Sequence, residues 1–211
     1  MFKKNIWDFW ADKYESLWVQ KYSLGPTRKA IINSLLPILK KNKKYKILDM
    51  GCGTGQLLRE LQSNFYDFDI EYMGVDASSN MIDIARTKDV KTTYYTCSIE
   101  ELKVSIEEFD IIFCSHSFPY YLEKDKAVDK FHSLLKKDGI LFLAQASANS
   151  VYDTFAMFFV KFTTSKATYP SINSLLTLTK GKFIKMYIVK IKEQFYMPTI
   201  ALFILKKEVT K

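Results

Sequence analysis

The stretch that most constrains the fold of this chain is ILDMGCGTGQL, residues 47–57, in which an apolar run ends at three closely spaced glycines. Such a run predicts a buried strand followed by a tight turn that opens a helix. Because glycine has no Cβ, Gly51, Gly53 and Gly55 let the backbone turn sharply and approach a ligand closely. The pattern therefore predicts a strand, loop and helix of an α/β fold, with a ligand site at the loop.

A carboxylate precedes these glycines. Asp49 lies at the expected carboxyl end of the strand, where it can accept hydrogen bonds from a ligand ammonium and would repel a pyrophosphate. The dinucleotide fingerprint is G-x-G-x-x-G, whereas the spacing here is G-x-G-x-G with an acid in front. A cationic adenosine ligand without phosphate therefore fits this loop better than a dinucleotide does.

Two later strand ends carry groups that a nucleoside needs. Asp76 closes the apolar stretch YMGVD, 21 residues after Gly55, and a carboxylate there can accept hydrogen bonds from both hydroxyls of a ribose. The segment CSIEEL, residues 97–102, follows the strand-like TTYYT, and its polar side chains and backbone N–H groups can read the edge of an adenine. Asp76 alone suits NAD equally well, so the prediction depends on the three elements together.

These three elements resemble the class I S-adenosylmethionine-dependent methyltransferases, and the resemblance covers most of the chain. In that family the first loop holds the methionine and ribose of the cofactor, the acid after strand two holds the ribose, and the loop after strand three reads the adenine. The resemblance implies methyltransferase activity, with S-adenosyl-L-methionine as cofactor and S-adenosyl-L-homocysteine as product. Carried over by position, the cofactor-binding residues are Asp49, Gly51, Cys52, Gly53, Gly55, Asp76, Ala77, Met81, Ser98, Ile99, Glu100 and Cys114.

The same resemblance implies two residues near the N-terminus. In many relatives a tyrosine of an N-terminal helix and an arginine before the first sheet-packing helix approach the methionine end of the cofactor. Here those residues are Tyr14 in ADKYESLW and Arg28 in YSLGPTRK. A guanidinium suits a carboxylate because it offers two parallel hydrogen bonds. An exposed arginine at a helix start is the alternative interpretation of Arg28.

Strand and helix patterns alternate along most of the chain, which favours an α/β, Rossmann-like doubly wound sheet with helices on both faces. The resemblance implies a mostly parallel, seven-stranded sheet whose last strand is inserted antiparallel beside strand five. Two long apolar or alternating runs, 183–194 and 199–208, predict the antiparallel hairpin that would supply it. Strands are also expected at 109–113 and 140–146, and helices at 27–40, 57–63, 79–87 with Ser78 or Ser79 as N-cap, and 126–138 with Leu135 on its apolar face and Gly139 as its stop.

The 211 residues fit a single domain. We expect four parts in it: an N-terminal aromatic helical lid over residues 1–28, a cofactor-binding core over 29–145, a substrate-side lid over 146–172, and a C-terminal helix and β-hairpin over 173–211.

The composition indicates no metal, disulfide or membrane segment. The three cysteines lie at separate predicted strand ends, so neither a disulfide framework nor a zinc site is expected. No apolar run approaches 18 residues, and three acids stand among the N-terminal aromatics, so neither a transmembrane segment nor a secretory signal is expected. A cytoplasmic location is the simplest interpretation.

The substrate should lie beyond the carboxyl ends of the strands, where three aromatic-rich segments are available. Aromatic side chains can surround a cationic or planar acceptor, or simply pack a lid against the body.

His116, in the loop after the strand FDIIF, is the candidate general base, with Tyr120 and Tyr14 as further catalytic candidates. A base is needed only if the nucleophile has a proton to lose, because alignment and exclusion of water supply most of the acceleration. The candidate substrate-binding residues are Trp10, Trp18, Tyr22, His116, Tyr120 and Tyr121.

The net charge of +8 includes five lysines in KKNKKYK, residues 40–46. A basic stripe can bind phosphate, but these lysines fall where solvated helix ends and strand faces are expected. We therefore expect a small-molecule acceptor methylated on N or O, no stable nucleic acid complex, and a monomer or homodimer. Two alternatives stay open: an RNA or protein methyltransferase that uses the basic surface, and an NAD- or adenosine-binding domain that is not a methyltransferase.

Overall fold

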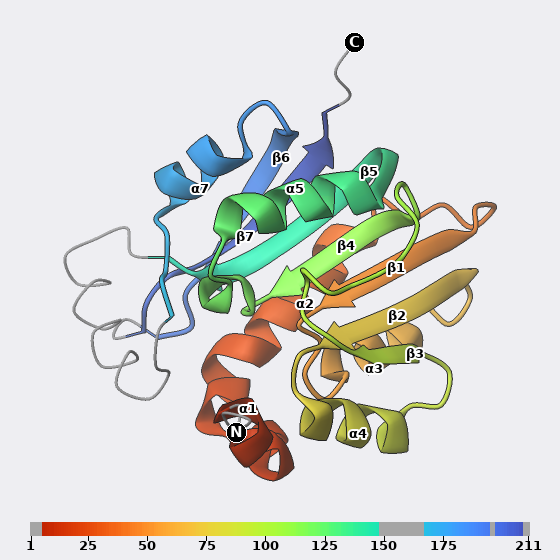
Figure 1. Cartoon of the computed structure of the whole chain (residues 1–211), viewed down its shortest axis with the longest axis vertical. Helices are drawn as coiled ribbons and strands as arrows, with labels where there is room; N and C mark the ends of the chain where they lie inside the picture. Colours follow the sequence, from red (N-terminus) through yellow and green to blue (C-terminus); the bar gives the residue numbers. More distant parts are fainter. Residues whose placement is uncertain (1–5, 148–166, 195–196, 209–211) are drawn as a thin grey trace.

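The computed structural model describes residues 6–147, 167–194 and 197–208, which form a seven-stranded sheet in the order β3-β2-β1-β4-β5-β7-β6 (Figure 1). The first five strands along the chain run parallel, whereas β7 pairs antiparallel with both β5 and β6. The predicted Rossmann-like sheet with a C-terminal strand inserted antiparallel beside strand five is confirmed. The strands are β1 Tyr45–Met50, β2 Ile70–Asp76, β3 Thr93–Thr96, β4 Phe109–Ser115, β5 Leu135–Ala146, β6 Phe183–Ile191 and β7 Ile200–Lys207.

Helices cover both faces of this sheet (Figure 1). On one face, α2 (Gly25–Leu35), α3 (Gln56–Asn64) and α4 (Ser79–Lys88) bury leucines and isoleucines against the strands. On the other, α5 (Lys124–Leu134) and α7 (Ile172–Thr179) complete a second apolar cluster. The order of the strands reverses between β1 and β4, so the loops at their carboxyl ends diverge and leave a crevice there.

The helices predicted over 57–63 and 79–87 are confirmed as α3 and α4, and the Ser78 side chain accepts a hydrogen bond from Met81 N at the start of α4. The helix predicted over 27–40 is wrong at its end. It stops at Leu35, because Pro37 has no backbone N–H with which to continue the helical hydrogen bonds.

The helix predicted over 126–138 was also extended too far. It ends at Leu134, and Leu135 already pairs with Phe109 of β4 and is fully buried. Gly139 is therefore part of β5 and is not a helix stop, whereas Asp138 takes the positive φ of 63°. Burial of Leu135 between strands outweighs the local helical pattern.

Short turns of helix precede the first sheet-packing helix: α1 (Ile6–Trp10), the 3₁₀ helix η1 (Ala11–Ser16) and the π-helical turn η2 (Gln20–Leu24). Figure 1 shows them beside the carboxyl ends of β1, β2 and β4. The expected lid over 1–28 thus lies near the crevice from residue 6 onward, whereas most of the lid expected over 146–172 lies outside the described residues. None of the helices in the described part of the chain is long and apolar enough to cross a membrane.

Glu15 fastens this N-terminal segment to the core. One of its carboxylate oxygens accepts hydrogen bonds from Thr54 Oγ1 (2.7 Å) and Arg59 (2.8 Å), and the other pairs with Lys88 (2.9 Å). Burial alone would raise the pKa of Glu15, but the hydrogen bonds from Lys88, Thr54 and Arg59 lower it to about 2. The segment is thus attached to the glycine loop, α3 and α4 at one point.

Replacing Glu15 by Gln is expected to lower the free energy of unfolding by about 1–2 kcal/mol at pH 7, a value that allows for solvent screening of a partly exposed group. Because its folded-state pKa lies below the unfolded value, the contribution of Glu15 is present above about pH 4.5 and is lost as the pH falls toward 2. Urea unfolding at pH 7 and pH 3 measures this. Asp83→Asn, which breaks an exposed ion pair with Arg86, is the matched control and should change stability by less than about 0.5 kcal/mol; equal effects of the two variants would contradict the role of Glu15.

Candidate functional site

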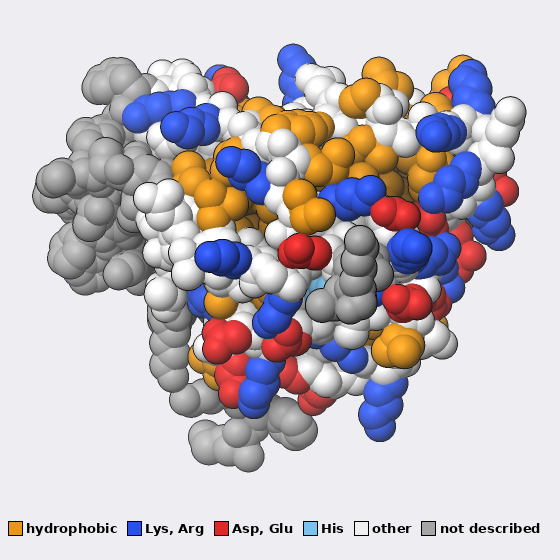
Figure 2. All heavy atoms as spheres, turned by 90° about the horizontal axis from the view of Figure 1, so that it is seen from above, with side chains coloured by type: hydrophobic (Ala, Val, Ile, Leu, Met, Phe, Trp, Pro, Cys, Tyr) orange, Lys and Arg blue, Asp and Glu red, His pale blue; other side chains and the backbone are white. Residues whose placement is uncertain are grey.

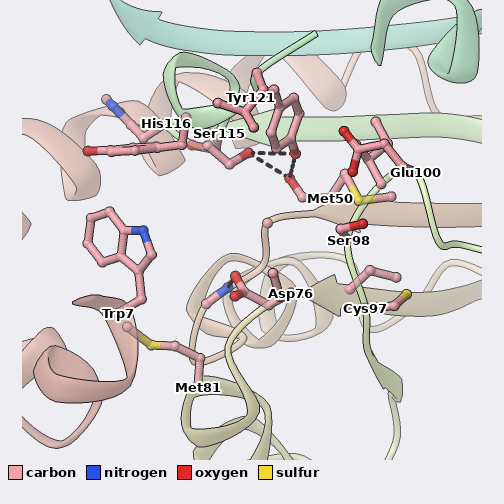
Figure 3. A pocket seen from close by; sticks show the side chains of 18 of the residues that line it. Trp7, Met50, Asp76, Met81, Cys97, Ser98, Glu100, Ser115, His116 and Tyr121 are labelled. Carbon is pink, nitrogen blue, oxygen red and sulfur yellow. Dashed lines mark hydrogen bonds between the residues drawn. The ribbon is translucent and has the colours of Figure 1, made fainter. Parts of the chain in front are cut away.

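A cavity of about 560 Å³ opens at the carboxyl ends of β1 to β4. Figure 3 shows Asp76 at its centre, Trp7 between His116 and Met81 at one end, and Cys97, Ser98 and Glu100 at the other. A smaller cavity adjoins it behind the glycine loop, and Tyr14 and Gly51 line both. Of the predicted cofactor residues, the large cavity is lined by Tyr14, Gly51, Gly53, Asp76, Ala77, Met81, Ser98, Ile99 and Glu100, and the small one also by Arg28, Asp49 and Cys52.

Two of the predicted cofactor residues line neither cavity. Gly55 precedes α3 with a φ of 74° and packs against Tyr94 and Ala85. Packing, and not contact with a ligand, therefore explains why residue 55 is glycine. Cys114 is fully buried in β4, and its thiol lies 3.2 Å from Ser117 Oγ. The cofactor role predicted for Cys114 has no support in this geometry, because the strand turns this side chain into the apolar core.

Backbone hydrogen bonds to β2 hold the glycine loop in position. Gly51 N and Cys52 N both donate to Val75 O, at 2.7 and 3.0 Å. Gly51 has a φ of 82°, and a Cβ at this position would lie 2.3 Å from the Cβ of Ser117. Only glycine meets both requirements at residue 51.

Asp76 joins the glycine loop to α4. Its two carboxylate oxygens accept hydrogen bonds from Gly53 N and Ser78 N, both at 2.9 Å. Burial raises the pKa of Asp76 despite these N–H donors. Since each carboxylate oxygen has a second lone pair, the side chain keeps acceptor capacity toward the cavity that it lines.

Asp49 and Gln56 place two unpartnered acceptors at the small cavity. Asp49 is 1% exposed, and neither its Oδ1 nor the Oε1 of Gln56 has a hydrogen-bond partner among the described residues. Burial, together with the charge of Asp76, raises the pKa of Asp49 to about 8. A buried acceptor without a donor is costly, so the pair is suited to a cationic N–H donor such as an ammonium.

Arg28 borders the same small cavity. Its guanidinium donates to Glu60 (2.7 Å) and to Gln20 Oε1 (2.9 Å), and its side chain is 11% exposed. The alternative of an exposed arginine at a helix start is therefore wrong. Gln56 was not predicted from the sequence, although a polar residue directly after the last glycine, ahead of two buried leucines, is a usable signal.

The far end of the large cavity is built by the loop after β3. Cys97 N donates to Asp76 O, which ties this loop to β2. Ser98 N donates to the carboxylate of Glu101 at 3.0 Å, so this N–H is already used within the loop. Recognition of an adenine edge at this end would therefore depend on the side chains of Ser98 and Glu100 and on the backbone around Ile99.

The near end carries two of the predicted catalytic residues, His116 and Tyr120, and the predicted substrate residue Tyr121. His116, Tyr120 and Tyr121 line the large cavity beside Trp7, whose indole meets the Tyr120 ring edge-on at 5.1 Å between centroids. Trp7 was not among the predicted site residues. The Tyr121 hydroxyl lies within hydrogen-bond distance of Met50 O and Ser117 Oγ, which orients that ring in the wall.

Three predicted substrate residues lie elsewhere: Trp10, Trp18 and Tyr22 do not line either cavity. Trp10 packs edge-on against Phe9, and Trp18 is 59% exposed. The segment changes from α-helical to 3₁₀ and π-helical geometry within 19 residues. Regular helical spacing therefore does not predict which aromatic side chains face the cavity.

Burial also sets the protonation of Tyr14 and His116. It raises the pKa of Tyr14 to about 12, with a further contribution from Asp76, so the phenol stays protonated near pH 7 and can donate a hydrogen bond. Burial and the charge of Arg28 lower the pKa of His116 to about 4. His116 is thus a neutral imidazole near pH 7 and a weak base, able to take a proton that becomes acidic during the reaction, whereas Tyr14 is not suited to act as a base.

Comparison with known proteins agrees with this geometry. Residues 47–139 match the family model of a methyltransferase domain. A ubiquinone/menaquinone biosynthesis C-methyltransferase of Campylobacter jejuni is 29% identical over 102 residues, which are 47% of this chain and 43% of that protein. A malonyl-[acyl-carrier protein] O-methyltransferase of Acetivibrio thermocellus is 30% identical over 118 residues, 54% of this chain and 41% of that protein. The chain thus matches less than half the length of these curated relatives.

A solved structure extends the similarity to the whole fold. One chain of the complex between the Haloferax volcanii Trm112 methyltransferase activator and a methyltransferase superposes with a TM-score of 0.79 at 14% identity, covering 99% of this chain and 100% of that one. The sheet order and the glycine loop are consistent with the match of residues 47–139 to a methyltransferase domain. Over residues 47–139 the chain is therefore similar to methyltransferases, and its fold is that of the superposed chain.

Proposed function

We propose that this protein transfers a methyl group from S-adenosylmethionine to N or O of a small-molecule acceptor. The observation that carries the cofactor assignment is the pair of unpartnered buried acceptors, Asp49 Oδ1 and Gln56 Oε1. The ammonium of the methionine portion supplies the donors that this pair lacks. NAD has no ammonium to supply these donors.

The other cofactor contacts follow from the lining of the two cavities. Arg28 borders the small cavity with Asp49, where it would hold the methionine carboxylate. Asp76 would accept from the ribose hydroxyls, and Ser98 and Glu100 would contact the adenine. When bound, the cofactor supplies a methyl group on a sulfonium, and the residues of this chain orient it and exclude water.

The positions of the basic side chains favour a small-molecule acceptor over RNA. The lysines of residues 40–46 precede β1 or, for Lys46, lie at its start, at the opposite edge of the sheet from the cavity and roughly 17 Å away along the strand at about 3.3 Å per residue. Lys41 pairs with Asp67 and Lys43 with Asp110. On the face drawn in Figure 2, Lys and Arg side chains are dispersed among acidic and apolar ones and form no continuous stripe. Methylation of RNA or protein therefore stays the alternative.

N or O methylation is proposed because a neutral histidine lines the acceptor end, where it can take a proton from such a nucleophile. The two curated relatives methylate C and O, as their names state. A monomeric or homodimeric state and a cytoplasmic location stay predictions.

Calorimetric titration with S-adenosylmethionine, S-adenosylhomocysteine and NAD in parallel tests the cofactor. Micromolar binding of the first two and none of NAD is expected. Binding of NAD alone, or of no ligand, would contradict the proposal. An assay of S-adenosylhomocysteine production over panels of amines, phenols, carboxylic acids, RNA and peptides then tests the acceptor, and turnover confined to RNA or peptides would favour the alternative.

A further inference from the structure

Thr27, in the first turns of α2, links the candidate base to a backbone carbonyl. Its Oγ1 lies 2.8 Å from Ser23 O and 2.9 Å from His116 Nε2, and the residue is fully buried. A carbonyl oxygen cannot donate, so the hydroxyl proton of Thr27 is used in the bond to Ser23. The Thr27 oxygen must then accept from Nε2–H of His116. This fixes the neutral imidazole as the tautomer whose Nδ1 carries a lone pair.

The backbone holds this ring at the end of β4. His116 has a φ of 61°, unusual for a residue with a Cβ, and its N–H donates to Ala144 O at 2.7 Å. His116 lines the large cavity, whereas Thr27 lines neither cavity. Because Nε2 is bonded to Thr27, Nδ1 is the ring nitrogen that is left for a ligand in the cavity, and Figure 3 places His116 beside Trp7 at this end. No described residue makes a hydrogen bond to Nδ1.

We propose that Thr27 is a positioning residue that holds Nδ1 of His116 toward the acceptor, and that the acceptor is a protic nucleophile, an amine or a hydroxyl compound. This inference rests on the proposed methyl transfer. A lone pair of the acceptor N or O forms the new bond to the methyl carbon, while the carbon–sulfur bond breaks and its electron pair stays on sulfur. The proton of the acceptor passes to Nδ1, which gives an imidazolium that later loses a proton to solvent.

The same geometry disfavours an ionised carboxylate as acceptor. A carboxylate has no proton to give, and its oxygens would face the Nδ1 lone pair without a donor between them. The lining of the large cavity in the described part of the chain includes no lysine or arginine that would hold such an anion. The proposal therefore separates amines and alcohols from carboxylic acids within the proposed function.

Nitrogen-15 NMR of the full chain at pH 7 reports the tautomer directly, because the sequence has two histidines. Wild-type His116 should show the Nε2–H form. Thr27→Val should produce a mixture that includes Nδ1–H, whereas Thr27→Ser should keep the wild-type form. His132, whose Nε2 lies 3.0 Å from Glu208 O, is the internal reference and should not change. An Nδ1–H or doubly protonated His116 in the wild type, or an unchanged His116 in Thr27→Val, would overturn the positioning role.

Turnover of an acceptor identified in the panel tests the chemical consequence. Thr27→Val should lower kcat at least tenfold with the Kd for S-adenosylhomocysteine unchanged within twofold, and Thr27→Ser should restore most of kcat. Turnover confined to carboxylic acids, or equal kcat in Thr27→Val, would overturn the acceptor class. If wild-type protein does not bind S-adenosylmethionine, the proposed function fails and the acceptor class fails with it, while the NMR result still decides whether Thr27 positions the ring.

Discussion

Asp49→Asn is expected to weaken binding of S-adenosylhomocysteine about 100-fold, equivalent to about 2.7 kcal/mol, and to leave binding of 5′-methylthioadenosine unchanged within twofold. Asp49 is buried with one unpartnered carboxylate oxygen beside Gln56. An amide removes the charge that would pair with the ligand ammonium, and its NH₂ group can oppose that ammonium. 5′-Methylthioadenosine has no amino acid portion, so the substitution should not change its affinity.

Binding of the cofactor should also release close to one proton at pH 7. The pKa of Asp49 is raised to about 8 by burial and by Asp76, so most of the free protein carries a neutral Asp49 at this pH. An ammonium favours the carboxylate and displaces its proton, so affinity should fall as the pH is lowered from 8 to 6. Calorimetry in two buffers of different protonation enthalpy measures the release.

The outcomes for the Asp49→Asn variant are separable. Loss of affinity for both ligands would indicate a distorted loop, and unchanged affinity for both would refute the ammonium site. Proton release that persists in the variant would assign it to another group, of which Asp76, whose pKa is also raised, is the nearest. Because the folded-state pKa of Asp49 exceeds the unfolded value, its contribution to the stability of the free protein is present below about pH 4 and is lost as the pH rises through 8.

The second large effect concerns the glycine loop. Gly51→Ala should lower the free energy of unfolding by about 2–5 kcal/mol, as the sum of a left-handed backbone penalty of about 1–2 kcal/mol and an overpacking cost of about 1–3 kcal/mol. The new Cβ would lie 2.3 Å from Ser117 Cβ and 2.5 Å from Ser117 Oγ. Ser117 cannot retreat freely, because its hydroxyl donates to Met50 O at 2.8 Å.

Gly181 provides the matched control. Its φ of 75° is close to the 82° of Gly51, but an added Cβ would meet no atom within 4 Å. Gly181→Ala should therefore cost only the backbone penalty of about 1–2 kcal/mol. Urea unfolding of both variants and titration with S-adenosylhomocysteine measure the difference; Gly51→Ala should also lose binding. Equal losses of stability would contradict steric confinement of the loop by Ser117.

The sequence by itself determined the parts that depend on neighbouring residues. The run from Ile47 to Leu57 combines an apolar strand, glycines at positive φ and a helix start, and each of these is a local property of the chain. The same holds for Ser78 as the cap of α4 and for the antiparallel C-terminal hairpin. Because parallel strands bring their carboxyl ends to one edge of the sheet, the sequence already predicts that Asp49 and Asp76 lie at one site.

Only the tertiary structure decided what depends on contacts between distant residues. Leu135 leaves its helix because it pairs with β4 and is buried there, and Trp7 rather than Trp10 or Trp18 lines the cavity. The bond between Thr27 and His116 joins residues 89 positions apart. Local propensity is a weak preference that long-range packing and hydrogen bonding routinely outweigh. The tautomer of His116 and the unpartnered oxygen of Gln56 therefore follow from the assembled fold alone.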